Sequence, residues 1–105
     1  MLYIVVPNMN DSISTISIDG KIYGLRFTYN ETGDYWNFSL LKEDRTTIIA
    51  MTKIVPNFPI YHFYKAMDIP DGVFGCLSNS ETVGRYAFVN KEAEFVYIPN
   101  KELED

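Results

Sequence analysis

Histidine and cysteine, the side chains most often used for acid–base or nucleophilic chemistry, each occur once in this sequence, as His62 and Cys76. A nucleophile–base pair would therefore have to be built from these two residues. His62 alternates with aromatic neighbours in Ile60-Tyr-His-Phe-Tyr64, and Cys76 lies in the apolar run Gly72-Val-Phe-Gly-Cys-Leu77. Neither segment suggests an oxyanion hole or a third group that would orient the histidine. We expect a histidine at the rim of a strand and a buried, unreactive thiol.

The carboxylates offer a second kind of chemistry. Glu31 and Asp34 could form a glycosidase pair, and Asp68 with Asp71 could belong to a calcium loop. Turn preference accounts for the first pair, because Asp favours turns and a Glu at a loop tip is solvated. The second pair lacks the dense spacing of oxygen ligands that calcium loops have. We expect no catalytic residue, no metal and no cofactor, and therefore no enzyme.

Length, composition and charge limit the classes of protein to which the chain could belong. A chain of 105 residues suits one domain, and 47% hydrophobic with 15% aromatic residues argues against intrinsic disorder. The net charge is −5 and the cations are scattered, which disfavours nucleic acid and anionic membranes as partners. The apolar N-terminal stretch ends at Pro7 and is too short for a signal peptide or a membrane span. We expect a soluble chain made in a cytoplasm.

The elements that would position these residues are strands, because apolar residues repeat with period two and no helical period is sustained. Asp19-Gly20 is a strong two-residue hairpin signal, since both turn positions require positive φ. This turn would pair Ile16 with Tyr23 and Ser14 with Leu25. One face then carries the alternating apolar set, and the other carries small and polar residues.

Trp36, the only tryptophan, could be a platform for a sugar or a member of the core. If Glu31 to Asp34 form a four-residue loop, the next strand returns in register. Gly33 would supply the left-handed position that such a loop needs. The expected cross-strand pairs are Tyr29 with Trp36, Phe27 with Phe38, and Leu25 with Leu40. All of these side chains then meet on one face, which favours a buried Trp36.

The rest of the chain predicts short strands separated by turns. We expect strands at 46–54, 73–77 and 94–98, a proline corner at 55–59, and a strand or edge at 60–64. A single helical turn at 89–93 would be the one short helix. The fold class is therefore all-β, a small antiparallel meander closing into a β-barrel or sandwich. The domain spans residues 1–99, and residues 100–105 form an acidic flexible tail.

Six aromatic residues exceed what one small core is expected to bury, although a tyrosine-rich core would explain the composition equally well. Tyrosine is enriched at protein interfaces because its ring is apolar and its hydroxyl is polar. If Tyr61 and Phe63 join the core, then Ile60, His62 and Tyr64 point outward on an edge strand. We expect these three residues to form an interface. The six aromatic residues are Tyr3, Tyr61, Phe63, Tyr64, Tyr86 and Tyr97.

The order and spacing of several sequence blocks resemble the phage baseplate plug protein family, the small plug proteins of cyanophage-type contractile tails. The resemblance covers about residues 10 to 99. It departs from the family pattern at Ile60-Tyr61, where plainer aliphatic residues are expected. The blocks are Ile18-Asp-Gly-Lys-Ile-Tyr-Gly-Leu25, Tyr29-Asn30, Tyr35-Trp-Asn-Phe-Ser-Leu40, Lys53-Ile-Val-Pro-Asn-Phe-Pro-Ile60 and Glu94-Phe-Val-Tyr-Ile-Pro99.

The resemblance implies a structural virion component of the tail baseplate, assembled in the bacterial host cytoplasm. It implies hub and tail-tube proteins as partners, self-association about the tail axis, and no catalytic residues. The alternative from the residues alone is a small cytoplasmic β-barrel that binds an apolar or sugar ligand without catalysis. A barrel with few strands has an interior filled by side chains, which disfavours that alternative.

Overall fold

The structure is a computed structural model that describes residues 1–58, 60 and 70–103. This part of the chain contains seven strands and one short helix. Their bounds are β1 Leu2–Ile4, β2 Asp11–Ile18, β3 Lys21–Asn30, β4 Tyr35–Lys42, β5 Thr47–Lys53, β6 Gly72–Ser78, β7 Ala93–Pro99 and α1 Asn100–Leu103.

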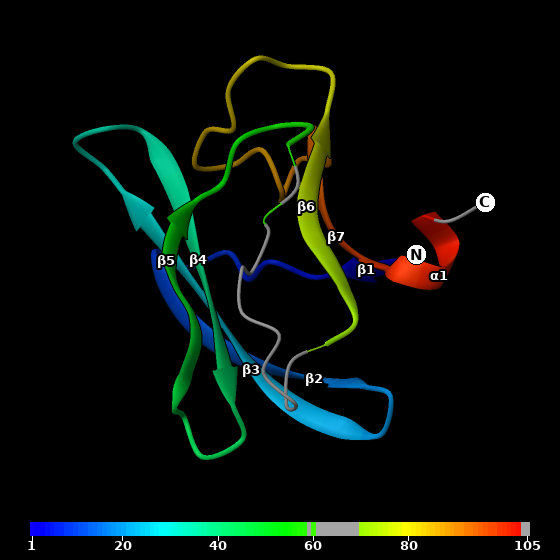
Figure 1. The fold of residues 1–105 in the computed structure, drawn as a ribbon. Helices are drawn as coiled ribbons and strands as arrows, with labels where there is room; N and C mark the ends of the chain where they lie inside the picture. Colours follow the sequence, from blue (N-terminus) through cyan, green and yellow to red (C-terminus); the bar gives the residue numbers. More distant parts are fainter. Residues whose placement is uncertain (59, 61–69, 104–105) are drawn as a thin grey trace.

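The strands form two antiparallel sheets that face each other (Figure 1). One sheet has four strands in the order β2-β3-β4-β5, which is a meander, and the other has three in the order β1-β7-β6. The expectation of an all-β antiparallel fold with at most one short helix is confirmed. Of the two closures that the sequence left open, the structure has the sandwich and not the closed barrel.

The first two hairpins follow the register expected from the sequence. Asp19 and Gly20 have φ of 52° and 80°, as a two-residue turn of this kind requires. Ile16 pairs with Tyr23 across this hairpin. In the next hairpin Tyr29 pairs with Trp36, and Phe27 with Phe38. Each register is set by a short turn that joins two strands consecutive in the sequence.

The loop between β3 and β4 differs from the prediction in one detail. The residue with positive φ is Asp34, at 54°, and not Gly33. Gly33 is needed for space instead, because a Cβ at this position would collide with the Tyr35 ring. The Gly33 amide also donates a hydrogen bond of 2.9 Å to the Asn30 side-chain oxygen. An Asp tolerates the left-handed conformation better than most residues, which allows this exchange of roles.

The core is a cluster of aromatic rings between the two sheets. Phe27 and Phe38 come from the four-stranded sheet, and Phe74 and Phe95 from the three-stranded sheet; all are at most 1% exposed. Ring centroids lie 4.9 Å apart for Phe38 and Phe95 and 5.1 Å apart for Phe27 and Phe95. These contacts join the two sheets directly, so the aromatic pairs hold the sandwich together.

Trp36 belongs to this core, as expected. It is 1% exposed and packs against Tyr29, with 5.3 Å between ring centroids, and against Phe88 at 5.8 Å. Its indole N–H donates a hydrogen bond of 3.0 Å to the carbonyl oxygen of Gly84. The buried polar atom is thus satisfied, and the ring offers no surface for stacking a sugar.

The proline corner after β5 carries the chain from the four-stranded sheet to the edge of β6. Pro56 forms an isolated bridge with Cys76, and the amide of Asn57 donates a 2.7 Å hydrogen bond to the Cys76 carbonyl. The Asn57 side chain donates a further bond of 2.7 Å to the Ser78 carbonyl. Ile60 then bridges Phe74. The corner therefore covers the open edge of β6.

Three terminal or loop features differ from the sequence prediction. Leu2–Ile4 form β1, which pairs with β7 at the far end of the chain. Asn100–Leu103 form the helix α1, in the segment expected to be only a flexible tail. Residues 85–91 form successive turns, and the expected helical turn at 89–93 is absent from this described loop. β1 and the start of α1 depend on contacts with β7 and with Asp71, which are distant in sequence, whereas local backbone hydrogen bonds form the turns at 85–91.

Replacement of Trp36 by Ala should lower the free energy of unfolding by about 3–5 kcal/mol, because it leaves a cavity beside Tyr29 and Phe88. Urea unfolding followed by circular dichroism measures this change. Tyr86→Ala removes a ring that is 60% exposed and should leave the midpoint almost unchanged. Equal midpoints for the two variants would contradict the buried position of Trp36.

Candidate interaction surface at the N-terminal edge

The catalytic candidates do not form a reactive site in the described residues. Cys76 is 1% exposed, and burial raises its pKa to about 11. The Glu31 carboxylate accepts a hydrogen bond of 2.9 Å from the Asn10 side chain. Asp34 accepts one from the Tyr29 hydroxyl, which raises the pKa of Tyr29. Both carboxylates are exposed, and each accepts a hydrogen bond from a neighbouring side chain, so these contacts give them a structural role.

His62 and Asp68 lie outside the described residues. Asp71 accepts a hydrogen bond of 2.6 Å from the Asn100 side chain, so it anchors the start of α1. Within residues 1–58, 60 and 70–103, no three His, Cys, Asp or Glu side chains gather as they would around a metal ion. In the same ranges no helix has the length and apolar character needed to cross a membrane.

The interface expected on the strand 60–64 needs a correction at its first residue. Ile60 is 6% exposed, and its amide donates a 2.6 Å hydrogen bond to the Phe74 carbonyl. Antiparallel partners share a face, and Phe74 faces the core, so the Ile60 side chain points inward. The expectation that Ile60 points outward is wrong. His62 and Tyr64 lie outside the described residues, and their part in an interface stays a prediction.

The expected surplus of surface aromatics is present in part. Tyr3 and Tyr86 are 61% and 60% exposed. Tyr97 is only 3% exposed, because β7 turns it toward the core. Burial, with the charges of Asp19 and Asp71 nearby, raises the pKa of Tyr97 to about 12. Tyr61, Phe63 and Tyr64 lie outside the described residues.

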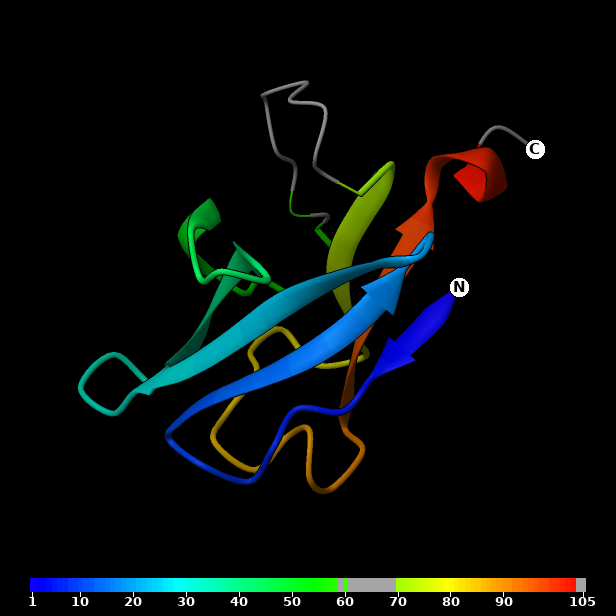
Figure 2. The same ribbon diagram turned by 90° about the horizontal axis from the view of Figure 1, so that it is seen from below.

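An exposed apolar surface that the sequence did not predict lies along β1. This strand pairs with β7 on one side and forms the edge of its sheet (Figure 2). Tyr3 is 61% exposed, and Val5, just beyond the strand, is 83% exposed. Met1 and Leu2 are also exposed. The only sequence signal was the apolar run before Pro7, which is too short to show alternation.

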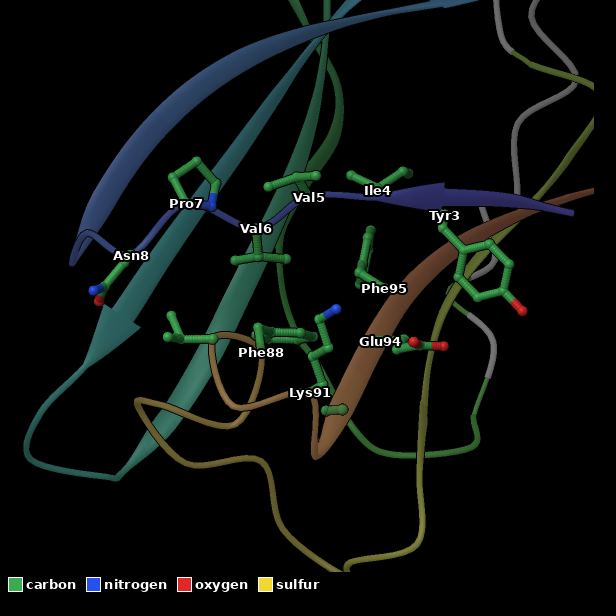
Figure 3. A pocket seen from close by; sticks show the side chains of 12 residues that line it. Tyr3, Ile4, Val5, Val6, Pro7, Asn8, Phe88, Lys91, Glu94 and Phe95 are labelled. Atoms are coloured by element: carbon green, nitrogen blue, oxygen red, sulfur yellow. The ribbon is translucent and has the colours of Figure 1, made fainter.

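A groove of about 520 Å³ lies beside this edge (Figure 3). One wall is the chain from Tyr3 to Asn8, and the other comes from Phe88, Val89 and the start of β7. Figure 3 shows Val6 projecting toward Phe88, with Lys91 and Glu94 along the opposite wall. The lining is mostly apolar and includes no histidine or cysteine. Such a groove suits apolar side chains from a partner.

Arg85 holds one end of the groove in place. Its guanidinium donates hydrogen bonds to the side-chain oxygens of Asn8, at 2.9 Å, and Asn10. The guanidinium carbon lies 5.5 Å from the Trp36 ring and 5.0 Å from the Tyr86 ring. These contacts tie the loop before β7 to the chain leaving β1, so both walls have a fixed separation.

The N-terminal ammonium group holds the other end of β1. It lies 2.6 Å from a carboxylate oxygen of Glu102 in α1, and both groups are partly exposed. The contact joins the first residue to the helix that follows β7. The edge strand thus has a side-chain contact beyond each of its ends, while its outer side stays accessible. We name this surface, made of β1, Val5 and the groove, the N-terminal edge.

Comparison with known proteins identifies the group to which this chain is similar. A family model described as "Cyanophage baseplate Pam3 plug gp18" matches residues 1–101. The match spans every element from β1 to the start of α1, and so includes the N-terminal edge. No curated protein matches the chain.

Native Cys76 should resist alkylation by iodoacetamide at pH 8. A pKa raised to about 11 leaves roughly one thousandth of the thiol as the reactive thiolate, and burial blocks access to it. Mass spectrometry after timed quenching measures the rate, with the urea-unfolded chain as reference.

Leu77→Cys in a Cys76→Ala background provides the control, because this neighbouring side chain is 38% exposed. The engineered thiol should react at least tenfold faster in the native chain. Equal rates for the two positions would contradict the buried environment of Cys76.

Proposed function

The chain belongs to the family of cyanophage baseplate plug proteins, and on this basis we propose that it closes or bridges the tail tip through protein–protein contacts. The family has a structural role in the phage baseplate, which places its members in the virion tail. The match over residues 1–101 carries this proposal, since it includes nearly the whole chain. We further propose the baseplate hub and tail-tube proteins as the partners, with assembly in the host cytoplasm.

The N-terminal edge supports a role that depends on contact. A free strand edge with exposed apolar side chains tends to aggregate unless a partner covers it. Tyr3 and Val5 present such side chains, and β1 can accept another strand on its outer side. We propose that a neighbouring baseplate protein covers this edge and fills the groove.

A structural role without catalysis agrees with the contacts of the candidate reactive groups. Cys76 is buried with a raised pKa, and the exposed carboxylates of the β3–β4 loop are bound to Asn10 and Tyr29. The chain is therefore proposed to act through its surfaces. Self-association about the tail axis would place several copies of the N-terminal edge around the tube.

The alternative function, a ligand-binding barrel, needs an enclosed space between the strands. The two sheets instead pack through aromatic rings whose centroids lie as close as 4.9 Å. The groove at the N-terminal edge is open and lies outside this core. A small-molecule site inside the fold is thus less well supported than a contact surface.

Tyr3→Asp combined with Val5→Asp should leave the fold intact and reduce incorporation into phage particles at least tenfold. Both side chains are exposed, so the charges cost little in the free chain, but they would be buried unpaired in the interface. The measurement is quantitative mass spectrometry of purified particles from a phage whose own copy is deleted and supplied in trans.

Val55→Asp with Phe58→Asp is the matched control, because it puts the same charges on exposed apolar residues of the proline corner, outside the N-terminal edge. This control should be incorporated like the wild type. Absence of the wild-type chain from particles would contradict the baseplate role. Normal incorporation of the Tyr3 and Val5 variant would remove the N-terminal edge from the interface.

A further inference from the structure

The outer face of the four-stranded sheet carries cations in an acidic protein. The core side of this sheet is apolar, so the alternate residues of β3, β4 and β5 point away from the sandwich. Asn37, Ser39 and Leu41 of β4 point outward, and each forms a row with the residues that pair with it on the neighbouring strands. Successive rows lie about 6.8 Å apart along the strand. Each row has one cation beside it, although the whole chain has a net charge of −5.

The register places two of the cations. Lys53 pairs with Asn37, and its ammonium nitrogen lies 4.8 Å from the centre of the Tyr35 ring. Arg26 pairs with Ser39 in the next row. Both side chains therefore start from strand positions on the outer face, and the backbone pairing fixes their separation.

The third cation reaches the face from a turn. Arg45 lies between β4 and β5 with φ of 74°, and its side chain folds back over the sheet. One guanidinium nitrogen lies 2.6 Å from the point where a Cβ on Gly24 would be. Gly24 pairs with Leu41, so Arg45 covers the third row. The glycine leaves the space that the guanidinium occupies.

Three carboxylates, Asp11, Glu43 and Asp44, lie near these three cations, but only Asp11 forms an ion pair with one of them. Asp11 forms a bidentate contact with Arg26, at 2.9 and 3.1 Å, which lowers the pKa of Asp11. Glu43 and Asp44 lie in the turn beside Arg45, where Asp44 accepts a 2.9 Å bond from the Thr46 amide. In the part of the chain that the structure describes, neither Arg45 nor Lys53 forms an ion pair.

Exposed aliphatic side chains accompany the cations. Ile13 pairs with Arg26 and is 51% exposed, and Ile22 is 46% exposed one row beyond Gly24. Arg is enriched at protein interfaces, and the exposed Ile13 and Ile22 add apolar area that a partner could cover.

We propose that this face, named the cationic face for Arg26, Arg45 and Lys53, docks on an acidic surface of a neighbouring baseplate protein. The proposal rests on the proposed function, since it assigns a partner chemistry within the same assembly. Carboxylates spaced along a partner strand would meet Lys53 and Arg45, while Arg26 keeps its contact with Asp11, and Ile13 and Ile22 would be covered at the rim. Complementary charge sets orientation and association rate more than affinity.

An acidic protein suits this face better than nucleic acid does. Nucleic-acid sites gather many cations on a protein that is basic overall, whereas this chain is acidic. The exposed Ile13 and Ile22 also favour a partner that offers apolar contact. DNA binding is therefore the competing outcome of the test.

The test uses Arg45→Glu with Lys53→Glu, supplied in trans to a phage that lacks its own copy. We expect particle incorporation to fall at least tenfold by quantitative mass spectrometry. Lys21→Glu with Lys101→Glu is the control, because it changes the net charge equally at two exposed sites outside the three rows that carry the cations. The control should be incorporated normally. Arg45→Gln with Lys53→Gln removes the charges with less repulsion, and should give an intermediate loss if the Glu variant fails to fold.

Several outcomes would overturn the proposal. Normal incorporation of both the Glu and the Gln double variants would show that the cationic face does not contact a partner. Incorporation of the wild-type chain in the same experiment would still support the baseplate role. An equal loss of particle incorporation for the control variant would show that the change in net charge, and not the cationic face, reduces incorporation. Absence of the wild type would contradict the baseplate role itself.

A binding assay distinguishes the two partner classes. Fluorescence anisotropy with labelled poly-L-glutamate should show weak binding that disappears at high salt and falls about two- to thirtyfold in the Glu variant. A labelled 20-base-pair DNA duplex should not bind. Tighter binding of the duplex than of poly-L-glutamate, dependent on Arg45 and Lys53, would overturn the assignment of an acidic protein.

Discussion

The packing of aromatic rings between two sheets is the interaction on which the rest of this structure depends. Phe27 and Phe38 on one sheet meet Phe74 and Phe95 on the other, with Trp36 packed nearby against Tyr29 and Phe88. Because side chains alternate along strands, fixing these rings inward also fixes which residues face outward. The cationic face is the direct reverse side of this core. The packing of the core therefore determines which side chains of these strands are exposed at the surface.

Local sequence patterns were sufficient for the half of the fold made by consecutive hairpins. The Asp19-Gly20 turn and the four-residue loop set the registers of β2, β3 and β4, because each turn joins neighbouring strands. Pairings between strands that are distant in the chain could not be predicted from the sequence. β1 joins β7 across nearly the whole chain, and the bridge from Ile60 to Phe74 turned an expected surface residue inward. The N-terminal edge was missed for the same reason, since three strand residues show no period.

The two edges of the three-stranded sheet differ in how far they are covered, and this difference bears on function. The proline corner covers β6 through Pro56 and Ile60, whereas β1 keeps an outer side with Tyr3 and Val5 exposed. Contacts at Arg85 and at the N-terminal ammonium group hold this open edge in a fixed shape. A preformed apolar edge loses little conformational entropy on binding. For a member of a baseplate plug family, we propose that this edge provides the apolar contact with a neighbouring protein and that the cationic face on the other sheet sets the orientation of docking.

A cryo-electron microscopy reconstruction of the baseplate from a phage that encodes this chain tests its proposed role most directly. At a resolution that separates strands, the map should contain the two-sheet domain at the tail tip. The outer side of β1 and the adjoining groove should be buried against a neighbouring protein. A tail tip without this domain, or with the domain present and β1 open to solvent, would contradict the proposed role of the N-terminal edge.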